Sequence, residues 1–106
     1  RFDLAAGASG GPRIISGTLQ TMLHILDFGL RPDAAVAAKR IHHQWSPDRL
    51  LVEEGFAPEL REALSAKGHA LEAYPGYAGA CQVAYASGGR LYGASDPRKG
   101  GRPAGR

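Results

Sequence analysis

The sequence is poor in cysteine and in long apolar runs. Its one cysteine, Cys81, cannot form a disulfide within the chain, so cysteine usage does not indicate a redox compartment. Because free cysteine is among the most buried residue types, we expect Cys81 to be buried. No apolar run approaches the roughly 20 residues of a membrane-spanning helix, so we predict no span. With 106 residues, 43% apolar and 22% charged, the sequence fits one globular domain or part of one.

Acidic residues are absent from the end of the chain. Four basic residues stand there without an acid: Arg98, Lys99, Arg102 and Arg106. The rest of the chain is close to neutral, so the formal net charge of +3 comes from this end. We predict a structured domain over residues 1–98 and a disordered basic tail over residues 99–106, which are polar and rich in glycine. The tail has no aromatic residues on which bases could stack, so we expect no nucleic-acid partner.

Helix and strand signals alternate along the chain. The patterns predict strands at 2–6, 41–45, 50–52, 69–74, 80–86 and 90–94, a hairpin turn at 87–89, and helices at 12–29, 32–38 and 58–67. The last helix would turn Leu60 and Leu64 inward. This order favours a mixed α/β (α+β) layer arrangement.

The long helix carries the clearest pattern. Ile15, Leu19, Met22 and Leu26 recur at helical spacing, and Leu23 widens the apolar stripe. So much apolar surface predicts a helix that is covered on two sides, inside a larger body. The chain also begins with arginine instead of an initiating methionine. We therefore expect this chain to be a piece of a longer protein.

A glycine-rich loop at residues 7–11 precedes this helix and is the first candidate site. Consecutive amides without side chains, at the positive end of a helix, can both point at one negatively charged oxygen of a phosphate, a carboxylate or an acyl-transfer intermediate. The loop matches neither a P-loop nor a dinucleotide-binding fingerprint. On these residues alone, a plain structural turn is somewhat favoured over a binding site.

Two other segments contain residue types that carry chemistry. His42 and His43 are adjacent, but neighbours on a strand point to opposite faces, so a hydrogen-bonded structural pair is favoured over a metal site. Ser95 and Asp96 precede a proline, a setting typical of turn capping and not of a nucleophile. Neither segment predicts catalysis by itself, and no metal or cofactor is expected.

Four segments together resemble the gamma-glutamyltranspeptidases. Residues 7–14 read Gly-Ala-Ser-Gly-Gly-Pro-Arg-Ile, similar to the family's Gly-Ser/Thr-Pro-Gly-Gly-x-Arg-Ile, and residues 27–29 match its Asp-Phe/Tyr-Gly helix end. Residues 39–48 follow its Pro-Arg-Ile/Phe-His-His-Gln-Trp-x-Pro-Asp run, with Lys39 in place of proline. Residues 91–98 read Leu-Tyr-Gly-Ala-Ser-Asp-Pro-Arg, as near the family's C-terminus. The resemblance covers nearly the whole chain.

The resemblance implies the fold and the chemistry of N-terminal-nucleophile hydrolases. These proteins form an αββα sandwich from two subunits of one self-cleaved precursor, and the domain over residues 1–98 would be the C-terminal part of the small subunit, leaving the sandwich incomplete in this chain. A threonine freed by the cleavage attacks the γ-glutamyl carbonyl of glutathione or a related donor. Water or an acceptor amino acid or peptide then releases the γ-glutamyl group.

The same resemblance assigns the oxyanion hole to the backbone N–H groups of Gly10 and Gly11. The nucleophile lies outside the chain, so the isolated chain should be inactive, and its expected partner is the remainder of the precursor. The family resemblance suggests a periplasmic or secreted bacterial protein. Ala8 and Ser9 replace the family's Ser/Thr-Pro and relax the entry to the glycine pair. A non-catalytic anion-binding module and a relative of the cephalosporin acylases are the alternatives.

Overall fold

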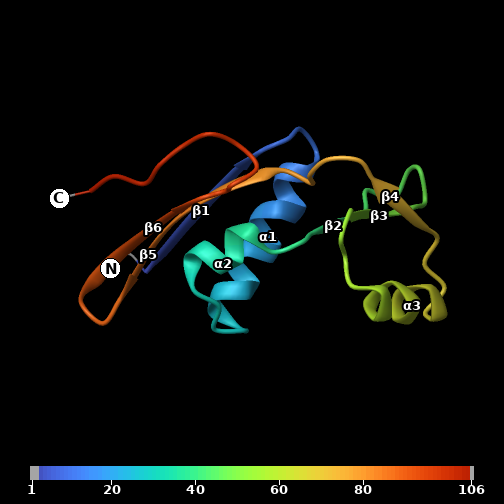
Figure 1. Ribbon diagram of the computed structural model, residues 1–106, viewed down its shortest axis with the longest axis horizontal. Helices are drawn as coiled ribbons and strands as arrows, with labels where there is room; N and C mark the ends of the chain where they lie inside the picture. Colours follow the sequence, from blue (N-terminus) through green and yellow to red (C-terminus); the bar gives the residue numbers. More distant parts are fainter. Residues whose placement is uncertain (1–2, 106) are drawn as a thin grey trace.

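The computed structural model describes residues 3–105 as a mixed α/β arrangement with two three-stranded sheets. The larger sheet is antiparallel, in the order β1 (Leu4–Ser9), β5 (Ala80–Ser87), β6 (Arg90–Ser95). Both α1 (Arg13–Leu26) and α2 (Pro32–Ala37) pack on one face of this sheet (Figure 1). The predicted hairpin turn joins β5 to β6, as expected from its two glycines.

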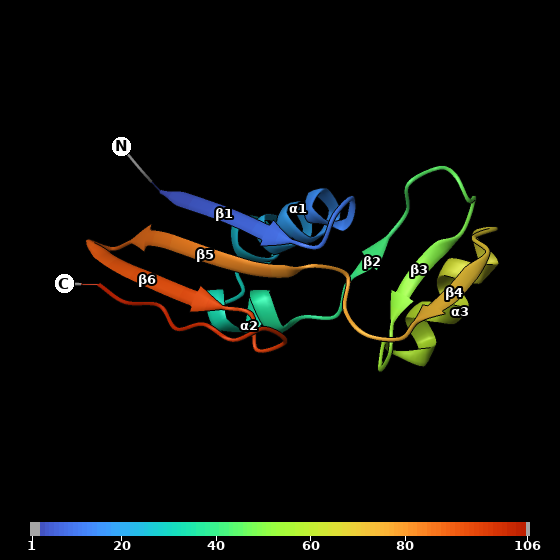
Figure 2. The ribbon, with the colours of Figure 1, turned by 90° about the horizontal axis from the view of Figure 1, so that it is seen from above.

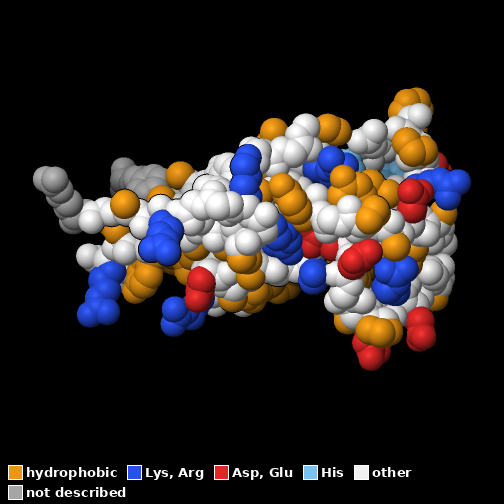
Figure 3. All heavy atoms as spheres, turned by 45° about the horizontal axis from the view of Figure 1, so that its top comes forward, with side chains coloured by type: hydrophobic (Ala, Val, Ile, Leu, Met, Phe, Trp, Pro, Cys, Tyr) orange, Lys and Arg blue, Asp and Glu red, His pale blue; other side chains and the backbone are white. Residues whose placement is uncertain are grey.

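The second sheet forms a separate lobe. Its order is β2 (Ile41–His42), β3 (Leu50–Glu53), β4 (Leu71–Tyr74), and α3 (Pro58–Ala66) joins the parallel strands β3 and β4. Figure 2 shows the two sheets side by side along the long axis of a molecule that measures 46 × 24 × 23 Å. Acidic side chains gather mainly on the α3 lobe (Figure 3). No described helix is long and apolar enough to cross a membrane.

The core lies between the larger sheet and its two helices. It is built mostly from small residues: Ile25, Ala35, Val36, Cys81, Val83 and Ala94. The predicted burial of Cys81 is confirmed, since none of its surface is exposed. Gly17 brings α1 close to the sheet, because a Cβ at this position would lie only 3.2 Å from Cys81 Sγ and 3.2 Å from the Ala78 oxygen.

Two predicted strands and one predicted helix face differ clearly from those observed. β1 continues through Gly7 to Ser9, because pairing with β5 satisfies its backbone despite the glycine. The strand predicted over 41–45 ends at His42, and Trp45 turns the chain with a φ of 72°. Leu60, predicted to point inward, is 53% exposed, since α3 buries no residue completely.

The face of α1 that packs on the sheet is not its apolar stripe. The helix buries Gly17, Thr21 and Ile25, whereas Ile15, Leu19 and Leu26 are 75%, 54% and 56% exposed. Within the described residues the helix is therefore covered on one side only, and its most apolar surface faces outward.

Residues 99–105 form no helix or strand. They run beside β6 (Figure 2), where a Cβ on Gly93 would lie 2.6 Å from Pro103 Cβ. The segment therefore lies directly against a backbone position that only glycine leaves open.

Candidate functional site

The glycine turn joins the end of β1 to the start of α1. Gly10 and Gly11 have φ values of 145° and 60°, a region that favours glycine. Their carbonyl oxygens accept hydrogen bonds from Arg13 N at 3.3 Å and Ile14 N at 3.0 Å. The turn is thus bonded to the first residues of the helix through its carbonyl groups.

This bonding fixes the direction of the amides. In a trans peptide the N–H of one residue points opposite to the C=O of the residue before it. The Gly10 carbonyl points into α1, so the Gly11 N–H points out of the helix end. The Ser9 carbonyl lies against Gly79, where a Cβ would stand 3.5 Å from the Ser9 oxygen, so the Gly10 N–H faces away from Gly79. An anion at this end of α1 would also meet the positive end of the helix dipole.

A cleft of about 410 Å³ opens beside the turn. Its lining residues are Ser9, Gly10, Arg13, Tyr74, Pro75, Gly76, Tyr77 and Lys99. The Arg13 guanidinium carbon lies 4.6 Å from the centre of the Tyr74 ring, and Lys99 Nζ donates to Ser9 Oγ at 2.9 Å. Within the described residues two cations and no acid line the cleft, which favours an anionic ligand.

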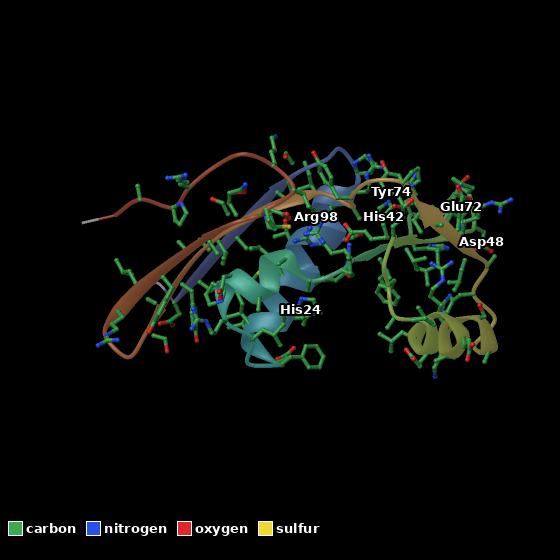
Figure 4. All side chains as sticks on the ribbon, in the orientation of Figure 1. His24, His42, Asp48, Glu72, Tyr74 and Arg98 are labelled. Atoms are coloured by element: carbon green, nitrogen blue, oxygen red, sulfur yellow. The ribbon has the colours of Figure 1, made fainter. Side chains whose placement is uncertain are left out.

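Behind the turn lies a buried network of charged side chains. Arg40 and Asp96 are fully buried and form an ion pair of 2.9 Å. Glu53, which is also buried, pairs with Arg98 at 2.8 Å, and Arg98 pairs with Asp96 at 3.1 Å. Arg98 also donates to the carbonyls of Val36 and Ala38 at the end of α2. In Figure 4 it lies between α2 and the larger sheet.

Asp96 is held ionised in this network. Burial alone would raise the pKa of Asp96. The amides of Arg98 and Cys81 and the guanidinium groups of Arg98 and Arg40 outweigh that effect and hold the pKa below its usual range. The carboxylate therefore stays charged at neutral pH.

The histidine pair makes structural hydrogen bonds. His42 Nδ1 lies 2.7 Å from Ser16 Oγ and its Nε2 lies 3.0 Å from Gln44 Oε1, while His43 Nε2 lies 3.0 Å from Asp48 Oδ1. Figure 4 shows His42 near the junction of the two lobes. No group of three metal-ligating side chains exists among residues 3–105.

The Ser95–Asp96 segment acts through its aspartate. Asp96 Oδ1 accepts the Arg98 N–H at 3.0 Å, so Asp96 makes the turn-capping bond that was expected of Ser95. Ser95 ends β6 and is not paired with a histidine base by any contact in the described structure. The geometry gives a nucleophilic role for Ser95 no support.

Sequence reasoning missed the charged network. The sequence signal for this network is Glu53, because a carboxylate directly after the apolar run at 50–52 indicates a buried charge. Nothing in the local pattern named Arg40 or Arg98 as its partners, since Arg98 and Glu53 are 45 positions apart.

The comparison with known families decides the identity. The family model described as gamma-glutamyltranspeptidase matches residues 1–106. The chain belongs to this family. It is 42% identical over 95 residues to the glutathione hydrolase proenzyme of Escherichia coli (strain K12), covering 90% of the chain but 16% of that protein. The chain therefore corresponds to a small part of that gamma-glutamyltranspeptidase relative.

Solved structures agree with this assignment. A gamma-glutamyltranspeptidase from Pseudomonas nitroreducens, complexed with L-DON, has a TM-score of 0.81 at 34% identity over 98% of this chain and 54% of its own. A cephalosporin acylase from Bacillus halodurans has a TM-score of 0.78 at 30% identity over 88% of this chain and 18% of its own. The chain thus has part of the mixed α/β fold of N-terminal-nucleophile hydrolases, as predicted.

Proposed function

We propose that this chain is the C-terminal part of the small subunit of an enzyme that hydrolyses or transfers the γ-glutamyl group. Glutathione and related γ-glutamyl compounds are the donors, and water, an amino acid or a peptide is the acceptor. The observation that carries the proposal is the Gly10–Gly11 turn at the start of α1, whose carbonyls accept hydrogen bonds from the first helical amides, so that the Gly11 N–H points out of the helix end. Family membership supplies the reaction class.

The turn would act on the tetrahedral intermediate. A threonine hydroxyl from outside this chain attacks the γ-carbonyl, and the threonine's own amino group takes the proton, since an α-amino group with a pKa near 8 is suited to that step. The carbonyl oxygen becomes negative, and the N–H groups of Gly10 and Gly11 donate to it. The amide C–N bond then breaks, the amine leaves with a proton, and water or the acceptor amine releases the γ-glutamyl group from the threonine ester.

The cleft beside the turn would receive an anionic group of the donor or acceptor. Arg13 is stacked on Tyr74, which holds its guanidinium at the cleft wall, and Lys99 enters from the carboxyl-terminal segment. A carboxylate bound there lies next to the Gly10 amide. This arrangement would place the reacting carbonyl close to the oxyanion donors.

The Gly11→Val variant of the complete precursor tests the proposal. No atom lies within 4 Å of a Cβ at Gly11, so the side chain has room, but a β-branched residue disfavours the observed φ of 60°. The amide should leave its position and turnover should fall by roughly a hundredfold or more, the cost of losing one oxyanion donor. Unchanged turnover in a folded and processed variant would exclude the oxyanion role and leave the anion-binding alternative.

The likeness to a cephalosporin acylase supports a second candidate, an acylase that acts on cephalosporin side chains. Both reactions use an oxyanion hole, so the glycine turn does not separate them. The complete protein should release product from a chromogenic γ-glutamyl anilide much faster than it deacylates a cephalosporin. The reverse preference would favour the acylase.

A further inference from the structure

The backbone of Gly79 packs directly against the glycine turn. A Cβ on Gly10 would lie 2.9 Å from Gly79 Cα and 3.4 Å from Gly79 N, so the two backbones are in direct contact. A Cβ on Gly79 would lie 3.5 Å from the Ser9 oxygen and 3.4 Å from the Arg13 oxygen. A side chain on Gly79 would therefore touch the residues on both sides of the turn.

A side chain at Gly79 would act on the Gly10 amide through the Ser9 carbonyl. The Ser9 carbonyl and the Gly10 N–H belong to one rigid peptide plane. A group that pushes on the Ser9 oxygen must tilt that plane and swing the Gly10 N–H with it. Glycine at position 79 thus leaves room for the observed orientation of the amide.

The charged network holds the segment that contains Gly79. Arg40 donates to the Gly79 carbonyl at 2.8 Å, Glu53 Oε1 accepts the Ala78 N–H at 2.7 Å, and Asp96 Oδ2 accepts the Cys81 N–H at 3.0 Å. All three charged side chains are buried. Short bonds to buried charged groups are the stronger class of hydrogen bond, so this segment is firmly fixed.

We propose that Gly79 is a positioning residue for the oxyanion hole, held by the buried Arg40–Asp96–Glu53 network and setting the direction of the Gly10 amide. The proposal rests on the proposed function of the Gly10–Gly11 turn. Gly79 does not touch the substrate; it acts through the Ser9–Gly10 peptide. Because φ is 83° at this position, any side chain would strain the backbone, and a side chain larger than a methyl group would add further atoms beside the Ser9 oxygen.

A size series at position 79 in the complete precursor tests this role. Gly79 has a φ of 83°, a conformation that strains any side chain, and an alanine Cβ would add only ordinary contacts there. Gly79→Ala should therefore lower kcat less than Gly79→Val, which should lower it by at least about thirtyfold, because a misplacement of about 1 Å can cost a hundredfold. The donor KM should change little. Gly88→Ala and Gly88→Val are the matched controls, since Gly88 has a φ of 56° and nothing within 4 Å of its Cβ. Both controls should keep kcat.

Inhibition by a boronate analogue of the γ-glutamyl donor separates positioning from general damage. Its tetrahedral anion needs the same N–H donors, so its inhibition constant should rise in Gly79→Val by the factor that kcat falls. Loss of kcat with unchanged boronate affinity would overturn the proposal, as would equal activity of the alanine and valine variants.

If Gly79→Val does not fold, Glu53→Gln takes its place. This variant should lower kcat and raise the boronate inhibition constant by the same factor, and the absence of that parallel change would also overturn the proposal.

The Gly11→Val variant separates the oxyanion role of the turn from the positioning role of Gly79. If Gly11→Val loses turnover and Gly79→Val keeps it, the oxyanion hole stands and the positioning role of Gly79 fails. If Gly11→Val keeps turnover, the proposed function of the turn fails, and the role of Gly79 fails with it.

Discussion

Asp96 links the stability of this domain to pH. Its pKa in the folded state lies below the ordinary value of about 3.9 that applies in the unfolded chain. The unfolded state therefore takes up the proton first as the pH falls. The stability that Asp96 contributes is fully present above about pH 4 and is lost as the pH falls through the folded-state pKa.

Unfolding temperatures of the complete protein between pH 7 and pH 2 check this linkage. The part of the wild type's stability that Asp96 supplies should be lost only below about pH 4. Asp96→Asn should be less stable at pH 7, by about 3–5 kcal/mol, because it leaves Arg40 buried without its counter-charge. Its acid-induced loss should also be shallower than that of the wild type. Parallel curves for the two proteins would mean that Asp96 is not the group that titrates.

Individual residues were predictable from sequence where their role is local. The turn at residues 10–11 lies within the glycine-rich loop predicted at residues 7–11, of which residues 7–9 belong to β1, and the burial of Cys81 followed from its residue type. The ion pair of Arg40 with Asp96 joins positions 56 apart, so only the folded chain brings them together. The same holds for the contact of Gly79 with Gly10.

Helix α1 carries more exposed large apolar side chains than the other described helices. Its outward residues, Ile15, Leu19 and Leu26, each expose more than half of their surface. We expect the remainder of the precursor to cover this stripe, because burying a leucine side chain is worth about 1.5–3 kcal/mol and an isolated exposed stripe of this size favours association.

Leu19→Lys in the complete precursor tests this expectation. The variant should lower the unfolding temperature by several degrees, which corresponds to about 1.5–3 kcal/mol. Leu60→Lys, on the exposed face of α3, is the matched control and should change stability by less than about 0.5 kcal/mol. Equal stability of the Leu19 variant and the wild type would show that the stripe stays exposed in the whole protein.

The elements were predictable in kind and order, but not in their packing. All three helices and the hairpin formed where periodicity and glycines placed them. The sequence pattern did not reveal which face of α1 packs on the sheet, because the buried residues are Gly17, Thr21 and Ile25 and not the apolar stripe. Close contact with the sheet required a small residue there, and apolar periodicity does not report that requirement.

In the proposed function, the molecule as a whole supplies a scaffold and one catalytic element. The chain covers 16% of its Escherichia coli relative and 54% of the solved Pseudomonas chain, so we expect the nucleophile and the rest of the donor site in segments outside it. We infer that the two sheets and the buried network serve to hold the amides of Gly10 and Gly11 at the end of α1. This role predicts the distance from each of the two amide nitrogens to the oxygen of a bound intermediate, and that distance can be measured.

The most direct measurement is a crystal structure of the complete, processed enzyme with a tetrahedral boronate analogue bound to its nucleophile. We predict that one boronate oxygen lies about 2.7–3.1 Å from both the Gly10 and Gly11 nitrogens, the distance expected of oxyanion donors. A boronate oxygen held by other groups, with both glycine nitrogens beyond hydrogen-bond distance, would contradict the oxyanion role of this turn.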